Sequence, residues 1–327
     1  MEERTEGEDY PRTLGELEGR FTRQEACVEY LQRMRWPEGF RCPACGGQDA
    51  WRTARGLWHC RACGRQTSVV AGTIFHASRK PLPLWFRAMW HITSQKYGAN
   101  ALGLQRVLGL GSYHTAWEWL HKLRRAMVRP GRDGLSGTVE VDETYVGGRK
   151  KGKRGRGAGG KEVVAVAVED KGEEGLGRIR LGHVADASGD SLGQFVSEVI
   201  EPGSTLRTDG WQAYLTVPVL GYGHTTVGSH ELKLVHLVVS LLKRWLLATY
   251  QGAVRPSHLT YYLDEFTFRF NRRSSRSRGK LFYRLVQQAL MIDPAPAPTL
   301  KGPALAFLQG RDNANLDPLD PDTDHNI

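Results

Sequence analysis

The sequence predicts an α/β protein in which a cysteine-rich segment and a helical segment precede a region of strands and helices. Three observations support this prediction. Two closely spaced cysteine pairs lie between residues 38 and 75. Apolar residues then recur at helical spacing from 82 to 129. Short valine-rich runs such as "TVEVDETYVGG" and "KEVVAVAVED" follow, and helical stretches return after residue 232.

Composition narrows the class of protein. The chain has 327 residues and a net charge of +10, which favours a polyanionic partner, with nucleic acid first and an anionic membrane surface second. The longest apolar run is far shorter than the roughly 20 residues that a membrane span needs. The polar, acidic start "MEERTEGEDYPR" is unlike a signal peptide. We therefore expect a soluble, cytoplasmic protein.

The chain divides into five predicted parts. These are a leader and helix (1–37), a cysteine-rich segment (38–75), a helical region (76–131), a region of strands and helices (132–292) and a disordered tail (293–327). Residues 16–36 have the spacing of one helix, in which the unpaired Cys27 is expected to be buried. The tail is rich in proline, alanine and aspartate and lacks the apolar residues needed to fold.

The cysteine pairs predict a structural zinc site. Cys42 and Cys45 form one C-x-x-C turn, Cys60 and Cys63 form the other, and fourteen residues separate the two. Four thiolates suit tetrahedral Zn²⁺ and leave no open position for a substrate water. The alternatives are a redox pair or unrelated buried cysteines. Three residues expected around such a zinc ribbon could contact DNA or fill a small core: Trp51, Trp58 and Arg61.

The helical middle of the chain favours a helix-turn-helix. A first helix over 102–108 would lead through a glycine-rich turn to a second over 113–127, and the second helix would present basic residues to the DNA major groove. These basic residues are Lys122, Arg124 and Arg125. A plain helical linker with a solvated basic face is the alternative.

Two aspartates stand out in the strand region. Asp142 interrupts an alternating strand pattern, where aspartate is disfavoured. Asp209 ends "STLRTDG", where a strand runs into a turn. Carboxylates brought together at strand ends suit Mg²⁺. A capping role for Asp142 and an ordinary turn role for Asp209 are the alternatives.

The apolar helix "KLVHLVVSLLKRW" carries one polar stripe. At about 100° per residue, His236, Ser240 and Lys243 share a face, while leucine, valine and tryptophan cover most of the remainder. Glu231 is a competing acid, but it lies about a third of a turn off this stripe. His236 is therefore either part of a metal site or a buried core histidine.

Five motifs together resemble bacterial insertion-sequence transposases of the DDE class that carry an N-terminal zinc ribbon, the ISXO-like group. These are "CPACGG…CRACGRQTSVVAGTIF", "VEVDETYVGG", "LRTDGWQAY", "SLLKRWLLATYQ" and "YYLDEFTFRFNRR". The resemblance covers roughly residues 20–290. It implies a ribonuclease H-like core with a five-stranded mixed sheet. It also implies that Asp142 and Asp209 are the two catalytic aspartates and that Lys243 is the lysine after the third ligand.

The third ligand departs from the family pattern. The common pattern has glutamate seven residues before the lysine, and here that position is His236. The resemblance implies catalytic Mg²⁺ or Mn²⁺ held by Asp142, Asp209 and His236. A neutral imidazole is a softer ligand than a carboxylate, so Mn²⁺ could be tolerated better than Mg²⁺.

The resemblance implies a transposase that cleaves transposon ends and joins them to target DNA, acting on double-stranded DNA as a homodimer or larger assembly. Two basic runs, 148–161 and 271–280, support DNA binding, although charge runs are often merely solvated. The predicted contacts are Arg149, Lys150, Lys151, Lys153, Arg154, Arg156, Arg272 and Arg273. An inactive zinc-ribbon DNA-binding protein and a nuclease or resolvase on the same fold are the competing functions.

Overall fold

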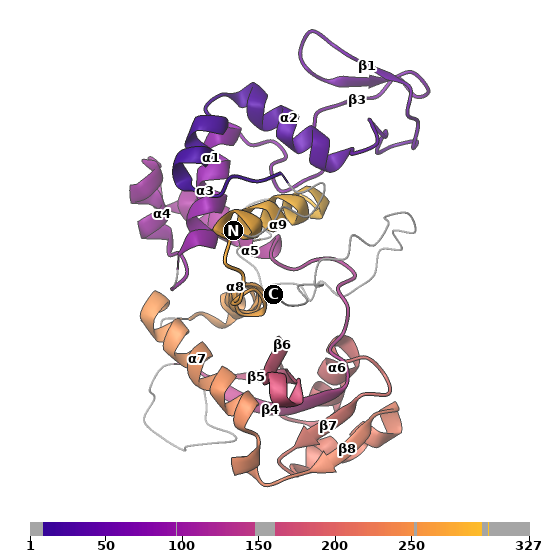
Figure 1. Ribbon diagram of the computed structural model, residues 1–327, viewed down its shortest axis with the longest axis vertical. Helices are drawn as coiled ribbons and strands as arrows, with labels where there is room; N and C mark the ends of the chain where they lie inside the picture. Colours follow the sequence, from indigo (N-terminus) through magenta and orange to yellow (C-terminus); the bar gives the residue numbers. More distant parts are fainter. Residues whose placement is uncertain (1–8, 96, 148–160, 252–253, 296–299, 301–327) are drawn as a thin grey trace.

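The computed structural model of the chain describes residues 9–95, 97–147, 161–251, 254–295 and 300. A helical part occupies one end of the long axis, and a sheet with helices on both faces occupies the other (Figure 1). The ribbon of strands β1 to β3 projects from the helical end (Figure 1). Among the described helices, none is long and apolar enough to cross a membrane.

Most of the N-terminal core comes from six helices, and Phe268 of a later helix also reaches it. The six helices are α1 (Leu14–Arg20), α2 (Gln24–Arg35), α3 (Leu82–Ser94), α4 (Ala101–Leu108), α5 (Tyr113–Arg125) and α9 (Arg278–Met291). The expectation of one helix over 16–36 was wrong, because the chain breaks between α1 and α2 at residues 21–23. The break lets the ring of Phe21 turn into the core, where its centroid lies 4.8 Å from that of Phe86.

Helix α9 returns to this first core after the sheet is complete. It lies beside the N-terminal helices, with the Phe282 ring centroid 5.5 Å from that of Phe86 on α3 (Figure 1). The start of the predicted tail is also packed, since Ala295 and Leu300 are buried in a small cluster with Tyr261. The sequence pattern shows that such segments are amphipathic or apolar, but not which core they join.

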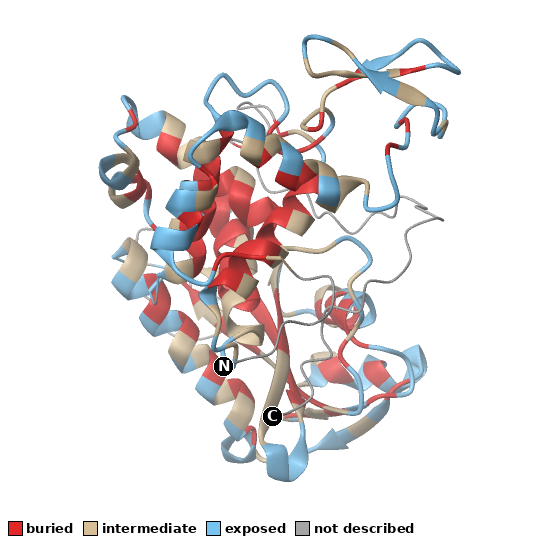
Figure 2. Ribbon diagram, turned by 45° about the horizontal axis from the view of Figure 1, so that its top comes forward, coloured by how far each residue is buried: buried red, intermediate tan, exposed pale blue. Residues whose placement is uncertain are grey.

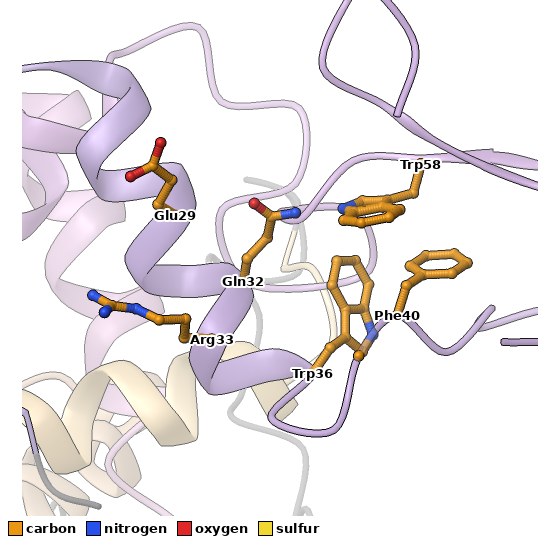
Figure 3. Close-up of a pocket in the computed structure, with 7 residues that line it drawn as sticks. Glu29, Gln32, Arg33, Trp36, Phe40 and Trp58 are labelled. Carbon is orange, nitrogen blue, oxygen red and sulfur yellow. The ribbon is translucent and has the colours of Figure 1, made fainter. Parts of the chain in front are cut away.

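The ribbon is a three-stranded antiparallel sheet in the order β1 (Ala50–Arg52), β2 (Trp58–Cys60) and β3 (Gln66–Thr67). An aromatic cluster connects the ribbon to the end of α2. Trp58 stacks on Phe40 with 5.2 Å between ring centroids, and Trp36 meets both rings edge-on (Figure 3). Trp58 is therefore a residue of the small core rather than an exposed contact residue.

The larger sheet has five strands in the order β6-β5-β4-β7-β8. Their bounds are β4 (Thr138–Val146), β5 (Glu162–Asp170), β6 (Leu176–Val184), β7 (Thr205–Thr208) and β8 (Gly223–Thr226). The first three pair antiparallel, whereas β7 and β8 run parallel to β4. Three antiparallel strands extended by two parallel strands make the ribonuclease H-like arrangement, which confirms the predicted fold class.

Helices cover both faces of this sheet. Helix α6 (Gly189–Val199) packs on one face, and α7 (Lys233–Tyr250) and α8 (Leu259–Asn271) pack on the other. The interior strand β5, "EVVAVAVED", is therefore buried on both sides, and its sequence is an almost continuous apolar run. Figure 2 shows buried residues concentrated in the strands and helices that face these interiors.

A buried ion pair connects the helical part to α8. Arg124 on α5 is 2% exposed, and its Nε donates to Glu265 Oε2 at 2.8 Å. Arg125 is also buried. The expectation that these two arginines lie on a DNA-facing surface of α5 was wrong, because α8 packs against that side of the helix. Lys122 is half-buried.

Candidate active site

Asp142 lies in the middle of β4, on the sheet face covered by α7. Strand alternation places it on the same face as Val146, which packs in the core with α7 and α8. Its side chain is 15% exposed, and its Oδ2 lies 3.4 Å from His236 Nε2 on α7. A half-buried carboxylate facing an imidazole across the sheet–helix boundary is a donor pair suited to a metal ion.

Asp209 is the residue directly after β7. Strands β4 and β7 run parallel with Glu140 opposite Arg207, so continuing both strands by two residues brings Asp209 beside Asp142. Asp209 Oδ1 accepts the backbone N–H of Trp211 at 3.0 Å, which fixes the turn that follows the strand. The predicted turn role and the predicted site role of Asp209 are therefore compatible.

The pKa of Asp142 reflects the acidic residues around it. Burial, followed by the charge of Glu143, raises the pKa of Asp142 to about 6. The charge of Asp209 raises it as well, whereas His236 lowers it. A cation bound between these groups would relieve the repulsion, which is the electrostatic pattern of a metal site.

Helix α7 presents the predicted polar stripe at its surface. The His236 side chain is 44% exposed, which is unlike a buried core histidine. Ser240 and Lys243 are exposed on the same side. Partial desolvation and the neighbouring Lys161 lower the pKa of Lys243, and Asp142 opposes this shift. Leu237, expected to be packed, is 50% exposed, because the buried face of α7 is narrower than the apolar sequence suggests.

Three polar residues around the aspartates were not predicted. Glu143 is buried on the opposite face of β4, where Tyr214 Oη donates to its Oε2 at 3.3 Å. Glu140 is 2% exposed and accepts two backbone N–H groups at the start of α7. Charged residues in the otherwise apolar strand were the available signal, but the sequence does not show their partners.

The four predicted zinc ligands come together. Their sulfur atoms all lie within 4.8 Å of one another. Cys42 Sγ is 3.7 Å from Cys63 Sγ, and Cys45 Sγ is 3.6 Å from Cys60 Sγ. A tetrahedron with Zn–S bonds of ~2.3 Å has edges of about 3.8 Å, so the four thiolates fit a zinc ion. Cys27 is buried in α2, as predicted.

Within the part of the chain that the structure describes, these cysteines are the only group of three or more potential ligands this close together. Asp142, Asp209 and His236 form a more open arrangement. The Asp142–His236 spacing of 3.4 Å is near the ~3 Å expected for adjacent ligands of an octahedral ion with ~2.1 Å bonds. The hard carboxylates and the imidazole therefore fit a small divalent cation.

The ribbon also has an exposed aromatic residue. Trp51 is 44% exposed and stacks on His59 with 4.1 Å between ring centroids. The Arg61 guanidinium lies 5.6 Å from the Trp51 ring centroid and pairs with Asp49. Of the three residues predicted around the ribbon, Trp51 and Arg61 are thus available at the surface, whereas Trp58 is packed.

The predicted DNA-contacting residues have different outcomes. Six of them, from Arg149 to Arg156, lie outside the described residues. Arg272 packs over the Phe268 ring at 4.2 Å, and Arg273 packs over Phe270 while donating to the backbone oxygen of Gly177 at 3.2 Å. Arg273 therefore also holds the end of α8 against β6, whereas Arg272 packs on its own helix.

The predicted helix-turn-helix consists of α4 and α5. Gly109 takes a left-handed conformation (φ 62°) at the end of α4, and the Ser112 side chain caps the start of α5. His114, at the exposed start of α5, pairs with Glu118 one turn later. A DNA-binding role for this pair of helices stays a prediction.

Comparisons with known proteins agree with this architecture. The profile of the ISXO2-like transposase domain matches residues 134–271, and that of a transposase zinc-ribbon domain matches residues 22–66. The first match ends with α8, and the second begins before α2 and ends in β3. No curated protein sequence matches the chain significantly.

Two solved structures resemble the chain weakly. One is a simian T-cell lymphotropic virus intasome in complex with PP2A regulatory subunit B56 gamma, with 15% identity, TM-score 0.30, and coverage of 59% of this chain and 74% of that chain. The other is a pre-cleavage Mos1 transpososome, with 10% identity, TM-score 0.27, and coverage of 63% and 75%. The two family matches, rather than these weak likenesses, show which domains the chain resembles. The chain thus contains a region that matches the ISXO2-like transposase domain, preceded by one that matches a transposase zinc ribbon.

Proposed function

We propose that this protein is a DNA transposase that uses divalent metal ions to cleave transposon ends and join them to target DNA. The observation that carries the proposal is the meeting of Asp142 and His236 at 3.4 Å, beside Asp209, on a ribonuclease H-like sheet. The match of residues 134–271 to the ISXO2-like transposase domain supports this reaction class.

The chain's own residues have distinct roles in this proposal. Asp142, Asp209 and His236 would together hold the catalytic metal, with Asp142 facing His236 across the sheet–helix boundary. The metal held there would supply the positive charge that activates the attacking oxygen and stabilises the leaving oxygen in a displacement at phosphorus. Lys243, on the same face of α7 as His236, would contact a DNA phosphate as a point charge.

The identity of the metal follows from the ligands. Magnesium prefers oxygen ligands, and an uncharged imidazole in place of a carboxylate weakens its binding. Manganese accepts nitrogen more readily. We therefore infer that the site works better with Mn²⁺ than with Mg²⁺, whereas the zinc ribbon holds a structural Zn²⁺ that takes no part in the chemistry.

The proposed partner is double-stranded DNA. The net charge of +10 favours binding of the DNA backbone, and the basic runs 148–161 and 271–280 are the proposed contacts. Joining two transposon ends to one target requires both ends to be held together, so we propose a homodimer or larger assembly on DNA. An enzyme that acts on bacterial DNA is expected in the cytoplasm.

A strand-transfer assay tests this function. Labelled DNA from either side of the coding sequence is incubated with the protein, target plasmid and Mn²⁺ or Mg²⁺. We expect metal-dependent nicking and joined products that Asp142→Asn abolishes. The matched control is Glu169→Gln, which changes a buried acid of the same sheet away from the site. Cleavage without joining would indicate a nuclease, and binding without either reaction would indicate an inactive DNA-binding protein.

A further inference from the structure

Glu140 is a buried acid two residues before Asp142 on β4. Its side chain is 2% exposed, and strand alternation places it on the same face as Asp142, toward α7. A buried carboxylate is costly unless its charge is compensated. The groups that compensate the charge of Glu140 therefore indicate its role.

The first partner is the start of α7. Glu140 Oε2 accepts the backbone N–H groups of Leu234 and Val235, both at 2.9 Å. The first N–H groups of a helix lack intrahelical partners, and the cap residue Leu232 has no side chain able to bind them. Glu140 thus supplies from the sheet the negative cap that the helix sequence lacks.

The second partner is on β7. Glu140 Oε1 lies 3.6 Å from Arg207 Nη1, and the same nitrogen lies 3.2 Å from Asp170 Oδ2. Arg207 is the register partner of Glu140 in the parallel pair β4–β7. Asp209 follows Arg207 by two residues, as Asp142 follows Glu140.

One carboxylate therefore joins the three elements that carry the site residues. It belongs to the strand of Asp142, it holds the helix turn that contains His236, and it pairs with the strand that leads to Asp209. We propose that Glu140 is the positioning residue of the metal site, setting the height and rotation of α7 so that His236 faces Asp142. The proposal rests on the metal-binding role of these residues proposed above.

Both oxygens of Glu140 have protein partners, so it acts through the ligands rather than as a ligand. Partners that orient metal ligands typically change metal affinity or activity by about 10- to 100-fold when they are mutated. Glu169 offers a matched comparison. It is equally buried in the neighbouring strand β5, but its partners are Arg178 and the backbone N–H of Ser136. None of these belongs to α7 or β7.

The test measures Mn²⁺ binding to the zinc-loaded, full-length protein by titration calorimetry, without DNA. The site-specific signal is the part of Mn²⁺ binding that Asp142→Asn removes. Glu140→Gln keeps the size and an acceptor oxygen but loses the charge, and Arg207→Gln perturbs the same junction from β7. Hydrogen exchange at residues 232–240 reports separately on the cap, and thermal unfolding reports on the fold.

We expect Glu140→Gln to weaken Mn²⁺ binding by at least tenfold and to accelerate exchange at the start of α7, with a smaller loss in Arg207→Gln. Glu169→Gln should retain wild-type Mn²⁺ affinity. If Glu140→Gln accelerates exchange but binds Mn²⁺ within about threefold of wild type, Glu140 is only a helix cap and the proposal is wrong, while the proposed function stands. If Glu140→Gln does not fold, the Mn²⁺ affinity of Arg207→Gln is used instead, and a value within about threefold of wild type makes the proposal wrong. If the wild type has no Asp142-dependent Mn²⁺ binding, the proposed function fails and this inference fails with it.

Discussion

Replacing Asp142 with asparagine should remove catalysis and yet stabilise the metal-free protein. Burial and the nearby carboxylates raise the pKa of Asp142 from an ordinary 3.8 to about 6. At about 1.4 kcal/mol for each pH unit, ionising this residue in the fold costs about 3 kcal/mol. Because the side chain is 15% exposed, solvent screens part of this cost. We therefore expect Asp142→Asn to raise the free energy of unfolding by about 1–3 kcal/mol at pH 7.

The stabilisation expected for Asp142→Asn depends on pH. Below about pH 4, Asp142 is protonated in both the folded and the unfolded protein and contributes nothing. Between about pH 4 and pH 6, the folded protein retains a proton that the unfolded chain has released, so stability falls as the pH rises. Above about pH 6 the full cost is present. The stability gained by Asp142→Asn should therefore grow from near zero at pH 4 to its maximum at pH 7.

Urea denaturation between pH 4 and pH 7 measures this difference in the free energy of unfolding. The protein keeps its structural zinc but is free of Mn²⁺ and Mg²⁺. Asp186→Asn is the control, because Asp186 is exposed and hydrogen bonds from Ser188 and Ser191 lower its pKa. Its loss should give no stabilisation at neutral pH. The account of the site electrostatics is refuted if Asp142→Asn destabilises the protein at pH 7, or if its effect does not change between pH 4 and pH 7.

Three further predictions concern the zinc site, the buried ion pair and the third ligand. Cys60→Ser should lower the zinc content, measured by elemental analysis, well below one ion per chain. It should also increase hydrogen exchange in the ribbon, measured by mass spectrometry. An unchanged zinc content would contradict the predicted zinc site. Glu265→Gln leaves Arg124 buried without its counter-charge and should cost about 3–5 kcal/mol in urea denaturation, part of which Arg124→Met should recover. A loss below about 1 kcal/mol would show that water reaches this pair. His236→Glu should shift the preferred metal for strand joining from Mn²⁺ toward Mg²⁺, and an unchanged preference would mean that residue 236 does not contact the metal.

The parts of the site that depend on short-range spacing could be predicted from the sequence. The four cysteines follow from two C-x-x-C turns, and the stripe of His236 and Lys243 follows from helical periodicity. Asp142 stood out because aspartate is unusual inside a strand. Asp209 sits in an ordinary turn motif, so its role depended on the family resemblance. The expectation of a five-stranded mixed sheet likewise came from that resemblance rather than from local pattern.

What could not be predicted depends on contacts between distant parts of the chain. Glu140 and the two backbone N–H groups of α7 that donate to it are 94 and 95 residues apart, and no local pattern connects them. Arg124 looked like a surface base on an amphipathic helix, but its partner Glu265 lies 141 residues away. Buried charges of this kind obey pairing rules that become visible only when the partner is known.

The central claim is that Asp142, Asp209 and His236 hold catalytic metal. Anomalous diffraction from crystals soaked in Mn²⁺ tests it most directly, with the same crystals of Asp142→Asn as a control. We expect a manganese peak within bonding distance of Asp142 Oδ2 and His236 Nε2, bordered by Asp209, and no peak there in Asp142→Asn. A wild-type map with no peak at these three side chains, at Mn²⁺ concentrations that support strand joining, would contradict the claim.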